Sequence, residues 1–258
     1  MVLLYFFVFI GGLMIGSFIN VVVHRLKTQE KIFPGRSHCP KCKKQISWYD
    51  NIPILSFILL RGRCRHCHKK ISWEYPLVEL ACGSLFLFNA LVILGNQNLL
   101  TLNAIALFDL GASFIFTGFF IIIFLYDLKY YLILDQLSIP LIIFALIINL
   151  FNYSLKNLII GGIIGLGFFA LQYFLSKGQW IGEGDLRLGL AIGFILGFPK
   201  VFLGIGLAYF LGSIIAVILL ATRKKSLTSK IPFGPFIVLA TYLIFLFGDF
   251  IINKYFRF

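Results

Sequence analysis

The sequence predicts an all-α, polytopic membrane protein with about eight transmembrane helices and one small cytoplasmic loop domain. Of the 258 residues, 60% are apolar and 13% are charged, whereas soluble domains have about 45–50% and about 25%. Long apolar runs such as residues 119–125 lack the alternating polar positions of a transmembrane β-barrel. This composition excludes a soluble globule, a disordered tail and a secreted disulfide scaffold.

Eight apolar stretches account for the membrane part, because a helix needs about 20 apolar residues to cross a bilayer. They comprise residues 2–23, 76–94, 106–126, 132–151, 158–175, 186–198, 201–221 and 233–252. The sixth is short enough to be re-entrant, but we predict a span because removing it would upset the charge asymmetry. The first lacks a preceding basic region and a small-residue cleavage site, so we expect a permanent helix and not a signal peptide.

Basic residues are divided unequally between the two sides of these segments, with 19 Lys or Arg on one side and 4 on the other. Cytoplasmic loops carry the excess of basic residues, so we expect both termini outside a cytoplasmic (inner) membrane. The net charge of +13 then reflects the orientation of the chain in the membrane, and we expect no nucleic-acid partner.

The apolar segments and the long loop divide the chain into three parts. These are a first transmembrane helix (1–23), a cytoplasmic loop domain (24–75) and a seven-helix membrane core (76–258).

Four of the five cysteines lie in the loop domain, as two C-x-x-C pairs separated by 21 residues. Cys39, Cys42, Cys64 and Cys67 together match the tetrahedral Cys₄ set of structural zinc sites. A loop of 52 residues is also too small for a good hydrophobic core without such a metal. We therefore predict a zinc-stapled fold.

Other interpretations of these cysteines remain open. The four thiols could be unrelated to one another. They could also form a redox site, but that would require a βαβ context. A catalytic zinc is the third interpretation, but four thiolates leave no open position for water. Three histidines could compete as ligands: His38, His66 and His68. The fifth cysteine, Cys82, lies in the second span and is expected to be a small buried apolar residue.

Acidic side chains beside membrane spans are rare and functional by default. Asp127 follows the third predicted span, and Asp185 opens the sixth in Gly182-Glu183-Gly184-Asp185. The topology places both at one depth on the cytoplasmic side. Two such carboxylates suit aspartyl protease chemistry, in which the ionised one takes a proton from water and the protonated one polarises the scissile carbonyl.

Structural roles for these acids compete with the catalytic one. Asp127 could be a topological marker at a helix end, and Asp185 or Asp135 could be a helix N-cap. Glu183 is a rival to Asp185, weakened by its position between two glycines. Asp109 and Asp249 lie near the outer side with no evident partner.

The chain resembles the prepilin peptidases, and the shared motifs occur in order over most of its length. The N-terminal ones are Gly16-Ser17-Phe18-Ile19-Asn20-Val21-Val22, His24-Arg25-Leu26 and Pro34-Gly35-Arg36-Ser37. Between and after the cysteine pairs come Tyr49-Asp50-Asn51-Ile52-Pro53-Ile54-Leu55-Ser56, Arg61-Gly62 and Tyr75-Pro76-Leu77-Val78-Glu79. The family's catalytic aspartates fall on Asp127 and on Asp185 of its G-x-G-D motif. One departure is Leu134, where the family often has proline.

The resemblance implies a bifunctional enzyme. It would cleave the basic leader of type IV prepilins and pseudopilins at the cytoplasmic membrane face, after a glycine, and then methylate the new N-terminus with S-adenosylmethionine. No soluble-type Gly-rich methyltransferase motif is present, so the residues that bind the methyl donor are unassigned; Glu79 and Asn20 are the available candidates.

Two other functions fit parts of the sequence. A proton-coupled transporter would use intramembrane acids facing a cavity at mid-membrane. A membrane-anchored zinc module would bind a cytoplasmic partner or nucleic acid through its basic loop. The expected partners on the favoured interpretation are prepilin precursors and the lipid bilayer.

Overall fold

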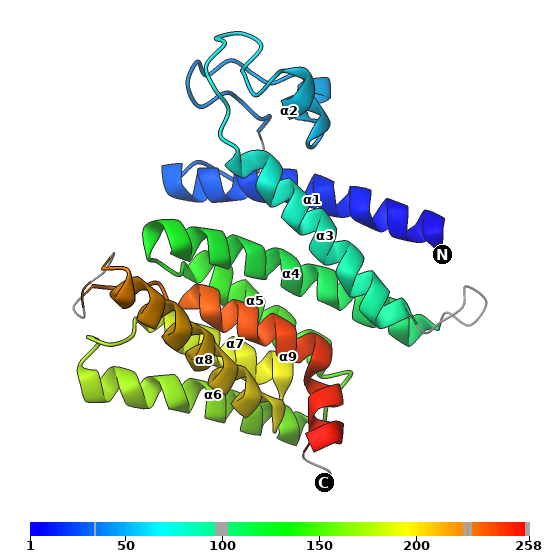
Figure 1. Ribbon diagram of the computed structural model, residues 1–258. Coiled ribbons are helices and arrows are strands. Elements are labelled where there is room, and N and C mark those ends of the chain that lie inside the picture. The colour runs from blue at the N-terminus through cyan, green and yellow to red at the C-terminus, as the bar shows by residue number, and fades with distance from the viewer. Residues whose placement is uncertain (34, 96–102, 224–225, 227–228, 256–258) are drawn as a thin grey trace. The chain divides into compact units, whose positions relative to one another are not determined.

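The computed structural model describes residues 1–33, 35–95, 103–223, 226 and 229–255 (Figure 1). These residues form nine α-helices, one short 3₁₀ helix at Trp48–Asn51 and no strand. The helices are α1 (Val2–Thr28), α2 (Leu55–Leu59), α3 (Glu74–Leu94), α4 (Ala104–Tyr130), α5 (Asp135–Asn149), α6 (Leu155–Ser176), α7 (Glu183–Leu196), α8 (Lys200–Ala221) and α9 (Gly234–Tyr255). The predicted all-α class is confirmed. Four residues used in the sequence analysis lie outside the described ones: Pro34, Lys224, Lys225 and Arg257.

Each of the eight predicted apolar segments forms a helix. In the described part of the chain, six of them, α1, α3, α4, α6, α8 and α9, have 21–27 residues and are long and apolar enough to cross a membrane. The two others, α5 and α7, have 15 and 14 residues. At about 1.5 Å per residue, α7 is roughly 21 Å long, shorter than a hydrocarbon core of about 30 Å.

The chain forms two compact units, residues 1–122 and 123–258. In the first unit, α1 and α3 pack together as antiparallel helices through glycines (Figure 1). A Cβ added at Gly12 would lie 2.7 Å from the Cα of Gly83, and one at Gly16 would lie 2.7 Å from the Cα of Glu79. Small residues at four-residue spacing allow such close backbone approach between membrane helices.

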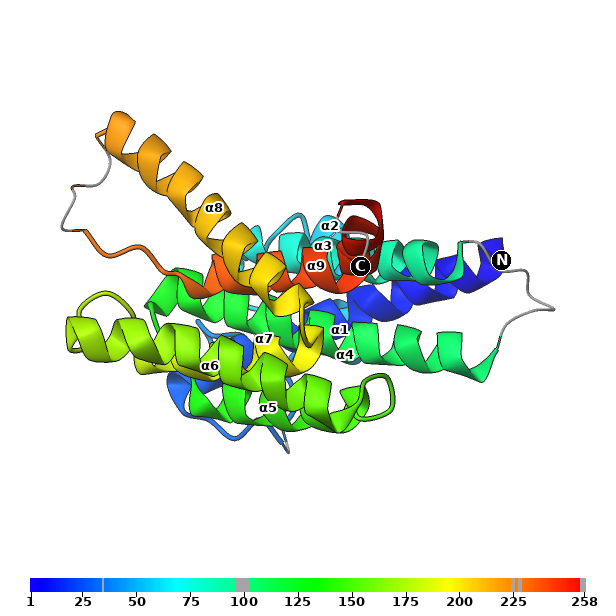
Figure 2. The same cartoon turned by 90° about the horizontal axis from the view of Figure 1, so that it is seen from below.

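In the second unit, α7 contacts α5, α6, α8 and α9 (Figure 2). Its closest neighbour is α6, because Gly161 and Gly165 of α6 meet the backbone at Gly193 and Gly189 of α7. Eight of the 14 residues of α7 are buried. A short helix enclosed by four others needs no lipid-facing surface of its own, and its N-terminal end carries Asp185.

Candidate active site

Asp127 lies in the last turn of α4, which continues to Tyr130, and not after the span as the hydropathy pattern placed it. The N–H of Tyr131 still donates to the carbonyl of Asp127 at 2.8 Å, which extends the helical hydrogen bonds past the carboxylate. The Asp127 side chain is buried, with 4% of the residue exposed. Its Oδ2 accepts the N–H of Gly234, the first residue of α9, at 2.9 Å.

Asp185 is the third residue of α7, so the N-cap interpretation was wrong in position: the N-cap is Gly182. The carboxylate reaches back along the helix end, where its Oδ2 accepts the Gly182 N–H at 3.0 Å. Asp185 is 7% exposed. Its other oxygen, Oδ1, is buried and has no hydrogen-bond partner among the described residues.

The fold brings Asp127 and Asp185 together within the second unit, near enough for their charges to interact. Ile133, in the turn between α4 and α5, packs against Gly184, which precedes Asp185, and against Gly234, which bonds Asp127. A Cβ added at Gly184 would lie 2.6 Å from the Cβ of Ile133, and one at Gly234 would lie 3.2 Å from its Cδ1. In the described part of the chain no basic side chain bonds to either carboxylate. Each is held by one backbone N–H at a helix start.

The other acids are placed differently. Asp135 is not an N-cap: it is the first residue of α5, its predecessor Leu134 is the N-cap, and its carboxylate pairs with Arg187. Glu183, the rival to Asp185, accepts the hydroxyl of Tyr173 at 3.1 Å at an exposed position. Asp249 does have a partner, since it pairs with the buried Lys200 ammonium at 2.7 Å.

The four loop cysteines converge. Their sulfur atoms all lie within 4.8 Å of one another, and the Sγ atoms of Cys39 and Cys67 are 4.0 Å apart. Four ligands at about 2.3 Å in a tetrahedron would be separated by about 3.8 Å. Among the described residues this cluster consists of the four cysteines, and the possible competing ligands His38, His66 and His68 do not belong to it.

The two cysteine pairs share one backbone geometry. In each, the N–H four residues after the first cysteine donates to that cysteine's carbonyl, from Lys43 to Cys39 at 2.8 Å and from His68 to Cys64 at 2.9 Å. Lys43 and His68 both adopt positive φ, 59° and 54°. Two matching turns thus present two thiols each, the arrangement that a Cys₄ metal site requires.

The electrostatics of the cluster also suit a cation. Backbone N–H groups, first that of Cys67, favour the Cys64 thiolate and lower the pKa of this thiol to about 7. At Cys42 the Lys44 N–H acts in the same direction, but desolvation and the neighbouring thiols prevail and raise its pKa to about 11. Four thiols this close cannot all ionise unaided, and a bound divalent metal ion would compensate the charge.

Two candidates for binding the methyl donor occupy anchoring positions in the first unit. Asn20 of α1 donates from Nδ2 to the Tyr75 carbonyl at 3.1 Å. Glu79 of α3 accepts the Ile54 N–H at 2.8 Å. Both side chains are buried. The Asn20 bond joins α1 to the first turn of α3, and the Glu79 bond joins the loop to α3.

The sequence analysis missed Gly234 and Ile133, which position the two aspartates. A signal for Gly234 is present, because glycine followed by proline (Gly234-Pro235) is a typical helix start. Nothing local in the sequence identifies Ile133.

Comparison with known proteins shows the family of the chain. Relatives named prepilin leader peptidase/N-methyltransferase include those of Stutzerimonas stutzeri (31% identical, covering 96% of this chain and 92% of the relative), Aeromonas hydrophila (32%; 98% and 94%) and Pseudomonas aeruginosa (30%; 96% and 91%). No solved structure matches the chain. Residues 10–93 match the bacterial peptidase A24 N-terminal domain, and residues 114–217 match the type IV leader peptidase family. The chain is therefore a multi-pass membrane enzyme that belongs to the type IV leader peptidase family.

Proposed function

We propose that Asp127 and Asp185 are the catalytic dyad of an aspartyl endopeptidase that cleaves type IV prepilins. The observation that carries this proposal is the environment of Asp185: a carboxylate oxygen that is buried, unpartnered among the described residues and close to a second buried carboxylate. A fold built for stability alone avoids such a pair, because buried polar atoms without partners and like charges near each other both cost free energy.

The geometry supports a shared-proton mechanism. Two adjacent carboxylates cannot easily both ionise, so one holds a proton and the other does not. The ionised member takes a proton from water as the water oxygen attacks the scissile carbonyl carbon. The protonated member donates its proton to the carbonyl oxygen. Collapse of the tetrahedral intermediate then breaks the C–N bond, and the amine leaves with a proton from the dyad.

Backbone contacts give each carboxylate a fixed orientation for this chemistry. The Gly182 N–H holds one oxygen of Asp185, which leaves Oδ1 to exchange a proton. The Gly234 N–H likewise holds Oδ2 of Asp127. Since both donors lie at helix starts, they are fixed by the helices and not by mobile side chains.

The substrate class follows from the relatives and from charge. The relatives are named prepilin leader peptidases, which indicates the leader of a prepilin as the substrate. We propose that the basic excess of the loops places the dyad and the cysteine cluster on the cytoplasmic side of the inner membrane, with both termini outside. A prepilin joins a basic leader to a hydrophobic helix, so its scissile bond would lie at this membrane edge.

Two further parts of the proposal concern cofactors. The four cysteines would hold a structural zinc ion, which would fix the loop and supply no chemistry to the dyad. N-methylation of the new N-terminus, using S-adenosylmethionine, is proposed from the relatives' names. The residues that bind this methyl donor are not assigned.

Mass spectrometry of a synthetic prepilin tests the proposal. Proteoliposomes that carry the wild-type protein should release the leader and, with S-adenosylmethionine present, add one methyl group to the mature fragment. Asp185→Asn should leave the prepilin intact. Cleavage by Asp185→Asn at the wild-type rate would contradict the dyad, whereas uncleaved prepilin with the wild type would favour the transporter or binding-module alternatives.

A further inference from the structure

The cysteine loop exposes large apolar side chains on one side of a short helix. Leu55, Ile58 and Leu59 are 50%, 63% and 71% exposed, and residues at this spacing share one face of α2. The opposite side holds Phe57, whose ring packs against Trp73 with centroids 4.8 Å apart. A soluble surface rarely gathers apolar side chains in this way unless something covers them.

Aromatic side chains add to this exposed set. Trp48, Trp73 and Phe33 are each more than 70% exposed. Tryptophan is enriched at the level of the lipid headgroups, where its ring is half in apolar and half in polar surroundings.

Contacts within the first unit place Phe33 and α2 beside the membrane helices α1 and α3. The Phe33 ring packs on Phe18 of α1 with centroids 5.6 Å apart, although α1 continues for ten residues beyond Phe18, to Thr28. The N–H of Ile54, which precedes α2, donates to Glu79 of α3, at the level where α3 touches Gly16 of α1. Phe33 and α2 therefore lie alongside the helix pair and not beyond its end.

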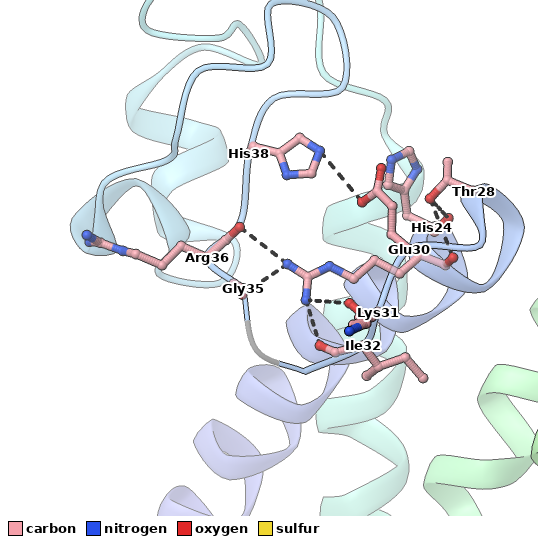
Figure 3. Close-up of polar contacts among 9 residues, drawn as sticks. His24, Thr28, Glu30, Lys31, Ile32, Gly35, Arg36 and His38 are labelled. Carbon is pink, nitrogen blue, oxygen red and sulfur yellow. Dashed lines mark hydrogen bonds and ion pairs between the residues drawn. The ribbon is translucent and has the colours of Figure 1, made fainter.

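The segment that follows α1 has hydrogen-bond partners for its backbone carbonyls, as a position beside the membrane helices requires. Arg25 is buried, and its guanidinium donates to the carbonyls of Lys31, Ile32, Gly35 and Arg36 (Figure 3). Carbonyl groups near hydrocarbon must find partners within the protein. One side chain thus satisfies four carbonyls beside the exposed Phe33.

Charge completes the pattern. Residues 24–75 contain 12 Lys or Arg and only 3 Asp or Glu. Arg65 pairs with Asp50 within the loop. The other exposed basic side chains are Lys27, Lys31, Arg36, Lys41, Lys43, Lys44, Arg61, Arg63, Lys69 and Lys70. We propose that the loop docks on a membrane surface that contains acidic phospholipids, with α2, Trp48, Trp73 and Phe33 inserted at the headgroup level and these basic residues on the lipid phosphates.

Fluorescence quenching by brominated lipids in nanodiscs tests this docking with the full chain. A Trp180→Phe background leaves Trp48 and Trp73 as the only tryptophans. Lipids brominated in the upper acyl chain should lower their emission about twofold, as expected for indoles at the headgroup level. The quenching should be stronger with phosphatidylglycerol than with phosphatidylcholine alone and should weaken at high salt.

A matched pair of variants tests the role of α2. Ile58→Ser with Leu59→Ser should reduce the quenching, whereas Gln45→Ser, another exposed loop residue, should not change it. Indoles that iodide quenches from the aqueous phase, and brominated lipid does not, would overturn the proposal. Indoles protected from both quenchers would also overturn it, since a protein surface would then cover the face. Equal quenching in neutral bilayers would overturn the acidic-lipid requirement.

Discussion

The two glycines of the G-x-G-D motif should respond very differently to alanine. At Gly184 the added Cβ would lie 2.6 Å from the Cβ of Ile133, where ordinary contact begins at 3.4 Å, so one backbone must move by 0.8 Å. The neighbour is a Cβ and not the tip of a flexible side chain, and it cannot rotate away. Asp185 is the next residue and would move with Gly184.

The size of the expected effect follows from this displacement. A misplacement of about 1 Å costs about 100-fold in rate, equivalent to about 2.7 kcal/mol of transition-state stabilisation. We therefore expect Gly184→Ala to lower kcat about 100-fold with a smaller change in KM. Initial rates of synthetic prepilin cleavage in proteoliposomes measure both, and thermal unfolding checks that the variant is folded.

Gly182→Ala is the matched control. Its Cβ would meet nothing nearer than Asp185 Oδ2 at 3.8 Å, and its φ of −88° and ψ of 164° suit alanine. Alanine in place of a favoured N-cap residue costs about 1 kcal/mol of stability but does not displace Asp185, so the cleavage rate should stay close to that of the wild type. Wild-type turnover by Gly184→Ala, or an equal loss in both variants, would refute the steric reasoning.

The remaining predictions concern the metal and the helix packing. Cys39→Ser should reduce the zinc content below the expected value of about one per chain, while Cys82→Ala, in α3, should leave it unchanged; elemental analysis measures both. In the wild type, zinc should be lost as the pH is lowered, because protons compete with the metal for thiolates, and a zinc content that does not depend on pH would argue against Cys₄ ligation. Gly165→Ala should lower the unfolding temperature, because its Cβ would meet the backbone of Gly189 and such overpacking costs about 1–3 kcal/mol. Gly167→Ala, with open space around its Cβ, should not lower the unfolding temperature.

The sequence was sufficient for the helical segments because hydropathy reports what contacts lipid, and it was less informative about where helices end. The first segment was expected to end at residue 23, but α1 continues to Thr28. Likewise α4 includes Asp127 and ends at Tyr130. Backbone hydrogen bonds continue through polar residues at a membrane edge, and no change in hydropathy marks their end.

The candidate sites were predictable from motif spacing and from the order of the membrane segments. Two C-x-x-C pairs predicted the convergence of four thiols, and the topology predicted that Asp127 and Asp185 lie at one depth on the same side. The residues that hold the dyad were not predictable in this way, because the Gly234 N–H reaches Asp127 across 107 residues of sequence. The pairing of Asp249 with Lys200 was missed for the same reason, since the two are 49 residues apart.

An N-cap role was one possibility for Asp135, because a carboxylate at a helix start often caps it, but the N-cap of α5 is Leu134. Its pairing with Arg187, 52 residues away, depends on how α5 and α7 pack. This exposed pair also provides the control for the dyad.

Single-turnover cleavage of a synthetic prepilin by Asp127→Asn, Asp185→Asn and the double variant tests the central claim most directly. Because the two carboxylates act as one unit, each single variant should lose as much activity as the double variant, while Asp135→Asn should retain the wild-type rate. A single variant with substantial residual cleavage, and a double variant with much less, would show that Asp127 and Asp185 act independently and would contradict the shared-proton dyad.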